Sequence, residues 1–464
     1  MFVRKRGRHS APCLRSEGRL KASHIPASST RRSTPFARIF SIVCVCSSFH
    51  LSQAHPQQTP APGVQQTSAV DRQNQQLQGR SDSADDREPF FNVNFPEQLS
   101  PLLPDGTARD WLHRNRLRLY GWLEGGYTYA STGNGLLPDA PSPNRFGNEF
   151  LLNGAWLIVD KVPLNEGWSW GFRADFYAGS DAALLRPLDS FGPTSTHMGT
   201  DFRQAYFSLH TPGINSHGID WTLGRQNVPT GYETLMAPYR PLYSESYFWI
   251  KYEVGSTSAL ATIHPTAKLD LIGGVVMGYN TVFELRGRSP SYVTRALYRP
   301  HFDKYTQLIA TVYTGPEPVA VTAGHLGTWQ TVAELQARHV WTPRIAQVAQ
   351  VHYATDVHDP ATKHASATQG AYLLTGFKID PKLYLRARGE WFSDPHGVRN
   401  ETPGTYSEAT AGINYMPVSW LNFRPEIRGD FAGQRSFAAS LGGPARRNQL
   451  TVAFDLIVKF DAFR

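Results

Sequence analysis

The chain has 464 residues, of which 41% are apolar, 12% aromatic and 18% charged. A formal net charge of +8 suggests nucleic-acid binding, but residues 1–54 hold ten of the basic residues and one acid, Glu17. The other 36 basic and 37 acidic residues give a net charge of −1, which removes the reason to expect a nucleic-acid binder. The mean hydropathy of −0.37 is too polar for a bundle of membrane-spanning helices.

Residues 1–54 have the organisation of a secretory signal peptide. Arg31, Arg32 and Arg38 precede an apolar run over residues 39–51, and Ser52-Gln53-Ala54 places small residues where a signal peptidase reads. The apolar run is shorter than the roughly 20 residues that span a bilayer as a helix. We expect Sec export and cleavage near Ala54, with a twin-arginine signal at Arg31-Arg32 as an alternative. A start codon assigned too far upstream explains the long basic segment.

All three cysteines, Cys13, Cys44 and Cys46, lie in this leader. After its removal the chain has no thiol for a disulfide bond, a zinc-thiolate site or a cysteine nucleophile. Residues 55–88 are rich in Gln, Ser, Pro and Asp, a composition that cannot bury a core. We therefore expect a signal peptide over residues 1–54, a disordered and then transitional periplasmic segment over residues 55–115, and a folded domain over residues 116–464.

From residue 116 onward, apolar and polar residues alternate. Leu421 and Phe423 fall on one face of an expected strand, while Arg424 and Glu426 fall on the other. A soluble β-sandwich or propeller also alternates, but several charges per strand on one face favour a barrel with a wet lumen. Strands of about 9–11 tilted residues are long enough to cross a membrane.

Tight, mostly proline-bearing turns alternate with longer connections, which is typical of outer-membrane barrels. The sequence predicts an all-β fold: a transmembrane antiparallel β-barrel of about sixteen strands, with fourteen or eighteen as alternatives and both termini on the periplasmic side. The expected strands cover residues 116–130, 149–160, 168–180, 200–211, 219–226, 250–264, 267–280, 291–299, 304–314, 328–341, 345–356, 368–379, 382–393, 405–416, 419–432 and 447–460.

Short motifs within residues 223–280 resemble known porins. Leu223-Gly224-Arg225-Gln226 resembles the end of the fifth strand of general bacterial porins. Gly231-Tyr232-Glu233, Ser244-Glu245-Ser246-Tyr247 and the glycine-rich stretch 273–280 resemble the OmpL-like outer-membrane β-barrel porins. The overall pattern extends the resemblance over residues 116–464. The chain departs from such barrels by ending on Arg464, so Phe460 or Phe463 must serve as the terminal aromatic residue.

The resemblance implies an ion- and solute-transporting pore in the outer membrane of a diderm bacterium, surrounded by outer-membrane lipid and assembled as a homotrimer. It also implies that the loop after the fifth strand, residues 227–247, folds into the lumen as a constriction. That loop supplies Tyr232, Glu233, Tyr239, Arg240, Tyr243 and Glu245. The alternating pattern adds charged residues of the lumen wall: Arg173, Asp175, Arg386, Arg388, Glu390, Arg424, Glu426, Arg428 and Asp430.

Opposed carboxylates and guanidiniums in these two groups would create a transverse field that filters polar solutes by size and charge. Alternatively, the wall arginines and acids form ladders that only stabilise the barrel, with about 0.2–1 kcal/mol for each cross-strand pair. Both roles are compatible with the pattern.

We expect passive diffusion of small polar solutes or ions, with no catalytic residues, cofactor or metal. The phosphate-loop and His-Glu-x-x-His motifs are absent from the sequence. Asp356, His358, Asp359 and His364 lie close together in sequence, but chance explains them better than a metal site. A closed barrel that serves as a membrane anchor or surface interaction module is the alternative, and a barrel enzyme would need a convergent histidine and acid at one rim.

Overall fold

The computed structural model describes residues 107–461, apart from 138–142, 166, 188, 191, 214–216, 253–254, 286–288, 302, 304, 318–327, 358–364, 398–399, 401 and 439–443. The predicted signal peptide, its cleavage site near Ala54 and the segment up to residue 106 therefore lie outside the described residues. His358, Asp359, His364 and the terminal Phe463 also lie outside them.

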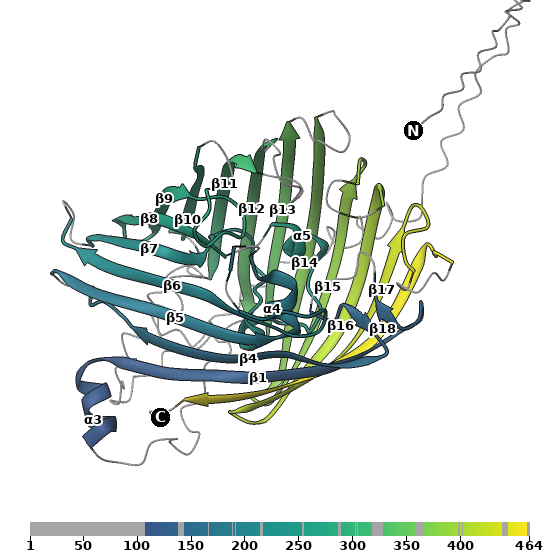
Figure 1. The fold of residues 1–464 in the computed structure, drawn as a ribbon, viewed down its shortest axis with the longest axis horizontal. Coiled ribbons are helices and arrows are strands. Elements are labelled where there is room, and N and C mark those ends of the chain that lie inside the picture. The colour runs from purple at the N-terminus through teal and green to yellow at the C-terminus, as the bar shows by residue number, and fades with distance from the viewer. Residues whose placement is uncertain are drawn as a thin grey trace, which may run out of the picture. The chain divides into compact units, whose positions relative to one another are not determined.

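Sixteen antiparallel strands close into a barrel, which confirms the predicted fold class (Figure 1). β1 closes the ring on β18, with Tyr120 opposite Asp461. A closed ring pairs the backbone groups of every strand on both sides, as lipid requires. The strands are β1 (Leu117–Ala130), β4 (Glu149–Lys161), β5 (Ser169–Gly179), β6 (Gly199–Thr211), β7 (Ile219–Asn227), β8 (Gly255–Thr266), β9 (Leu269–Val276), β10 (Ser291–Tyr298), β11 (Thr306–Glu317), β12 (Thr328–Thr342), β13 (Ile345–Val357), β14 (Ser366–Asp380), β15 (Leu383–Asp394), β16 (Gly404–Val418), β17 (Leu421–Ala432) and β18 (Asn448–Asp461).

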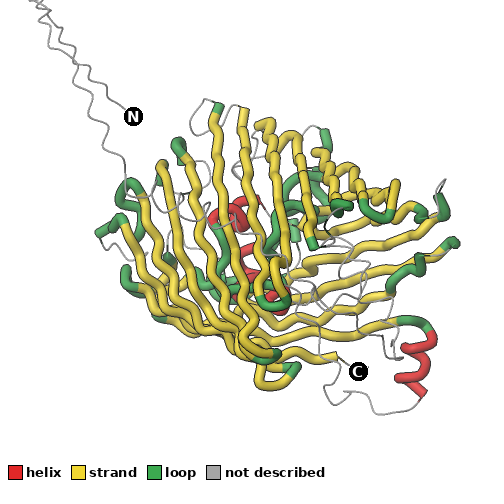
Figure 2. The backbone as a smooth tube through the Cα atoms, turned by 180° about the vertical axis from the view of Figure 1, so that it is seen from behind, coloured by secondary structure: helices red, strands yellow, loops and turns green. Residues whose placement is uncertain are grey.

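Few other elements occur in the described residues. β2 (Gly135–Leu136) and β3 (Phe146–Gly147) pair within the connection from β1 to β4. The helices are α3 (Thr107–Arg114), α4 (Ser180–Leu185), α5 (Tyr247–Tyr252) and the 3-10 helix η3 (Ala237–Tyr239). α4 and α5 lie inside the ring of strands (Figures 1 and 2). None of the helices in the described part of the chain is long and apolar enough to span a bilayer.

Two predicted strand boundaries differ from the structure by four residues or more. The strand expected over residues 250–264 begins at Gly255, because residues 247–252 form α5 and bury Phe248 and Trp249 inside the barrel. The strand expected over residues 267–280 ends at Val276. Gly278 and Asn280 have φ angles of 111° and 49°, which turn the chain out of the sheet.

The connections at the two ends of the barrel differ in length. Turns such as those from β8 to β9 and from β14 to β15 are tight, whereas the connections at the opposite end are longer. The connection from β7 to β8, residues 228–254, is the longest. β1 begins and β18 ends at the end with the tight turns. In outer-membrane barrels, the end with the short turns faces the periplasm.

The two faces of the wall have opposite character. Phe150, Leu223 and Leu335 point outward and are 75%, 62% and 61% exposed. Glu124 and Arg428 point into the lumen and are fully buried. The exposed apolar face has the character of a lipid-facing surface, and the sequence pattern of period two set it.

The outward apolar face predicts that the cost of a charged substitution depends on its depth in the membrane. Leu456 lies near the middle of β18 and Leu450 near its external end, with 41% and 43% exposure. We expect Leu456→Arg to lower the free energy of unfolding in lipid vesicles by about 2–4 kcal/mol, and Leu450→Arg by about 1 kcal/mol or less. Urea unfolding of both variants measures the difference. Equal losses of unfolding free energy in the two variants would contradict a barrel whose strands have their middle at the centre of the membrane.

Candidate functional site

The connection from β7 to β8 folds back into the barrel, and we call residues 228–252 the lumen loop. Its residues bond to side chains of β1, β12, β15 and β17, of which β1 and β12 lie far apart around the ring. The loop therefore crosses the lumen between β1 and β12.

Apolar packing holds the lumen loop on three sides. Leu235, Met236 and Trp249 pack with residues of β1 and β4 that include the stacked pair Trp122 and Trp156. Phe248 belongs to a second cluster with residues of β8 to β16, and Leu242 to a third on β13 and β14. Each fully buried side chain of this size contributes about 1.5–3 kcal/mol relative to exposure. The loop is thus packed like a core segment.

Glutamates of the wall bind the backbone of the loop. Glu334 of β12 accepts the N–H of Gly231 at 2.8 Å. Glu426 of β17 accepts the N–H groups of Tyr243 and Ser244 at 2.9 and 3.2 Å. Glu390 of β15 accepts those of Tyr247 and Phe248 at 2.6 and 3.1 Å. These bonds satisfy backbone donors that have no sheet partner inside the barrel.

Arginines of the wall bind the loop's carbonyl groups in the same way. Arg388 donates to the carbonyl of Ser244 at 2.9 Å, and Arg428 donates to that of Glu245 at 2.8 Å. Arg424 donates to the carbonyl of Ala237 at 3.1 Å. Side chains of β15 and β17 therefore bind both the N–H groups and the carbonyl groups of one stretch of the loop backbone.

Glu233 links the loop to β15 by an ion pair. Its carboxylate contacts Arg388, which also binds Glu408 of β16 at 2.6 Å. The other oxygen of Glu233 accepts the N–H of Ser246 at 2.8 Å and closes the loop on itself. All three charged side chains are at most 1% exposed, so each depends on its partners for compensation.

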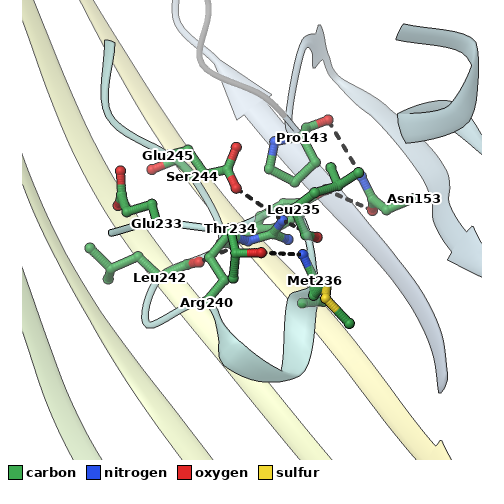
Figure 3. Close-up of polar contacts among 12 residues, drawn as sticks. Pro143, Asn153, Glu233, Thr234, Leu235, Met236, Arg240, Leu242, Ser244 and Glu245 are labelled. Atoms are coloured by element: carbon green, nitrogen blue, oxygen red, sulfur yellow. Dashed lines mark hydrogen bonds and ion pairs between the residues drawn. The ribbon is translucent and has the colours of Figure 1, made fainter. Parts of the chain in front are cut away.

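Arg240 is the second charged anchor. Its guanidinium pairs with Glu124 of β1 and lies 3.6 Å from Glu245. It also donates to the carbonyls of Leu235 and Leu242, both at 3.2 Å, and so ties the loop's turn together (Figure 3). Arg240 thus joins the loop to β1 while Arg388 joins it to β15.

The loop tyrosines that the sequence singled out differ in role. The hydroxyl of Tyr243 donates to Asn153 of β4 at 3.0 Å. Tyr239 ends η3 and packs on the first apolar cluster, and Tyr232 lies under the guanidinium of Arg338 at 4.8 Å. The hydroxyl of Tyr247 donates to Asp430 at 2.8 Å. These contacts span both sides of the lumen.

Glycines make room for the loop. A Cβ on Gly126 of β1 would lie 2.7 Å from the hydroxyl of Tyr243, and one on Gly412 of β16 would lie 2.8 Å from Leu242. Gly231 has a φ of 67°, which favours glycine where the loop meets Glu334.

The structure brings most of the predicted residues into direct contact. Arg388, Arg424 and Arg428 touch the loop rather than standing across an open gap from its carboxylates. Arg428 also pairs with Asp430 on its own strand at 2.8 Å. Arg386 lies over the ring of Tyr384 at 5.0 Å, and Arg173 pairs with Asp175 on β5 at 2.7 Å, away from β15. Several further residues bind or line this site without a distinguishing sequence motif: Glu124, Arg203, Arg295, Glu334, Arg338, Glu408 and Asp455. The alternation of residues predicts that these side chains point inward, but it does not predict which residues they contact.

An open cavity lies beside the loop. It has a volume of about 70 Å³ and lies between the first half of the loop and the wall formed by β5, β6, β10 and β12. Its charged lining residues are Arg173, Arg203, Glu233, Arg295 and Arg338. The cavity thus lies between the loop and a part of the wall that the loop also contacts, through Arg295 of β10 and Glu334 of β12.

Two external connections are joined by Asp189. Its carboxylate accepts the N–H groups of Val282, Phe283 and Glu284 at 2.8–3.0 Å. Burial alone raises the pKa of Asp189, but these bonds outweigh burial and hold the pKa below its usual range. The carboxylate is therefore charged at neutral pH.

The described residues contain no group of three or more His, Cys, Asp or Glu side chains arranged to hold a metal ion.

A family of β-barrel proteins matches this arrangement in sequence. The family described as "Putative beta-barrel porin-2, OmpL-like" matches residues 116–460, most of the chain and all sixteen strands up to the end of β18. The chain belongs to this family. The porin fold and this family place the protein in an outer membrane. No curated protein matches the chain in sequence.

Solved outer-membrane channel structures resemble this OmpL-like porin. An anion-selective porin from Comamonas acidovorans superposes with a TM-score of 0.53 at 12% identity, covering 74% of this chain and 99% of its own, and this likeness shows the fold alone. OmpF of Salmonella typhi gives a TM-score of 0.48 at 12% identity, over 75% and 98% of the two chains. The channel DcaP of Acinetobacter baumannii gives a TM-score of 0.48 at 10% identity, over 74% and 97%.

Proposed function

We propose that this OmpL-like porin gives small polar solutes or ions a passive path across the outer membrane. The observation that carries the proposal is the lumen loop. It crosses the barrel between β1 and β12, and a cavity with charged walls remains between the loop and β5, β6, β10 and β12. Charged side chains that line a space are tolerated where water fills it. Transport of this kind needs no chemical step.

Glu233, Arg240, Tyr243 and Glu245 set the width of the path by holding the loop, and so form its constriction together with the wall. The lumen-facing acids and arginines of β15 and β17 act first as anchors for the loop. Arg173 lines the cavity beside the loop, and Asp175 pairs with Arg173. In this proposal the filter is the gap that the anchored loop leaves.

A closed barrel that serves as an anchor or interaction module is the second candidate. The observation that favours it is the packing of loop side chains in three buried apolar clusters. The two candidates differ in whether the cavity beside the loop connects the two ends of the barrel.

Single-channel recording separates them. We expect the protein, purified from outer membranes of a porin-deficient host, to give stepwise currents in a planar bilayer. The currents should be smaller than the barrel's width alone would allow, because the loop occupies much of the lumen. A folded, heat-modifiable barrel that carries no current would exclude diffusion and favour the closed barrel.

We also propose that the protein assembles as a homotrimer after export and removal of residues 1–54. Native mass measurement in detergent tests the assembly. N-terminal sequencing of the outer-membrane form tests cleavage near Ala54. A monomer, or an intact leader, would contradict the respective proposal.

A further inference from the structure

Two basic side chains lie together outside the lumen, at the periplasmic end of β1 and β4. Lys161 is the last residue of β4 and is paired with Leu117, the first residue of β1, so that Arg116 lies beside it at the edge of the barrel. The two charges are close enough to interact. Lys161 has the outward parity of Leu157, which is 43% exposed on the same strand, and therefore faces lipid rather than the lumen.

Neither of these charges has an acidic partner in the part of the chain that the structure describes. One terminal nitrogen of the Arg116 guanidinium is buried there and donates to no acceptor. Arg118, two residues further on, differs: it points inward and lies 3.7 Å from Asp461. A buried donor without an acceptor costs free energy, so an acceptor from outside the chain would stabilise Arg116.

The backbone at Arg116 is also strained. Its φ angle is 57°, in a region that residues other than glycine rarely adopt. This conformation interrupts the strand alternation between Arg116 and Leu117. Strain of this kind is common where a side chain is held in place for a ligand.

Indole rings surround the ammonium group of Lys161. Its nitrogen lies 3.3 Å from the centre of the Trp170 ring, in a cation–π contact that keeps the charge at the surface. Trp170 is 50% exposed and Trp168, in the periplasmic turn, is 74% exposed. Tryptophan rings of this kind lie at the level of the lipid headgroups. The two basic side chains are therefore at the depth where a phosphate group of the periplasmic leaflet lies.

We propose that Arg116 and Lys161 bind the phosphate of an anionic phospholipid whose acyl chains lie along the outward face of β1 and β4. A guanidinium binds phosphate through paired N–H donors, and an ammonium adds a point charge. Basic pockets on membrane proteins bind lipid headgroups in this way. Beyond the pair, Leu119 and Val159 continue the outward face toward the middle of the membrane and offer the acyl chains an apolar surface. Two unpaired positive charges call for a partner with a net negative charge.

Native mass spectrometry of the whole protein in detergent tests the proposal, with phosphatidylglycerol or phosphatidylcholine added as the probe. We expect the wild type to retain phosphatidylglycerol in preference to phosphatidylcholine. Neutralising one basic residue near an anionic headgroup weakens binding about fivefold, so Arg116→Gln with Lys161→Gln should weaken it about thirtyfold. Lys161→Gln alone should weaken it about fivefold and serves if the double variant does not fold. Equal retention of the two lipids by the wild type would overturn the proposal.

Arg344→Gln with Lys382→Gln is the matched control. These exposed residues lie in the turns from β12 to β13 and from β14 to β15, at the same end of the barrel. The control removes the same charge and should bind phosphatidylglycerol like the wild type. Equal losses in both double variants would show attraction by the overall charge of that end and would overturn the site.

The same spectra exclude other occupants of this face. If the double variant of Arg116 and Lys161 keeps the lipid but no longer assembles, the face binds a second copy of the chain and the lipid proposal is wrong. If inorganic phosphate displaces phosphatidylglycerol completely, the acyl chains contribute nothing and the lipid assignment fails. Because the pair lies outside the lumen, single-channel currents should be the same in the double variant and the wild type.

Discussion

Replacing Arg388 with methionine is expected to release the lumen loop from β15 and to increase the single-channel conductance. The change leaves Glu233 and Glu408 buried without their shared counter-charge, and it removes a bond to the carbonyl of Ser244. Breaking a buried ion pair by removing one partner costs about 3–5 kcal/mol. At 1.4 kcal/mol for each factor of ten, the docking equilibrium of the loop shifts about 10²- to 4 × 10³-fold toward release. The backbone ladder of the barrel is unaffected, so the protein should remain folded.

A double variant provides the control for this prediction. Adding Glu233→Gln to Arg388→Met removes one of the two carboxylates that the first change leaves unpaired, and it should restore part of the loop's docking. Conductance and protease cleavage within residues 228–252 report on the loop independently. If Arg388→Met conducts like the wild type and its loop stays protected, the ion pair does not hold the constriction.

Replacing Arg240 with methionine is expected to reduce the yield of folded, heat-modifiable barrel. Arg240 contacts Glu124 and Glu245, and Asp181 and Asp455 also lie within electrostatic reach. Without this cation several buried carboxylates must share Arg424, which binds Asp455 and lies 3.5 Å from Glu124. The loss of stability is again about 3–5 kcal/mol, because one partner of a buried ion pair is removed. The turn of the loop depends on the same side chain, since Arg240 also binds the carbonyls of Leu235 and Leu242.

Two companion variants sharpen the Arg240 experiment. Glu124→Gln in the Arg240→Met background should recover folding, since it removes the nearest unpaired carboxylate. Arg344→Met removes an exposed arginine and should fold like the wild type. The yield is read as the fraction of protein that migrates as the heat-resistant form. A normal yield for Arg240→Met alone would show that the other contacts of the loop suffice to place it.

The alternation of residues by itself determined the fold class and most of the strands. In β17, Leu421 and Phe423 point to lipid and Arg424 and Glu426 point to the lumen, as a period of two requires. The proline-bearing turns separated neighbouring strands, and the sixteen-strand barrel follows from that local information. The long connection after β7 was also visible, because a stretch without alternation interrupts the strand pattern.

Only the tertiary structure decided which charges meet. Closure of the ring sets Glu124 of β1 against Arg240, and the entry of the loop sets Glu233 against Arg388, which is 155 residues away in the chain. The alternation of residues predicts only that a side chain points inward, and it does not predict which residue lies opposite that side chain. The same limit explains the wrong strand start at residue 250. Phe248 and Trp249 are as apolar as strand residues, but the space that buries them exists only after the barrel has closed. The position of the cavity beside the loop also depends on tertiary packing, because strands from the whole chain form the wall against which the loop lies.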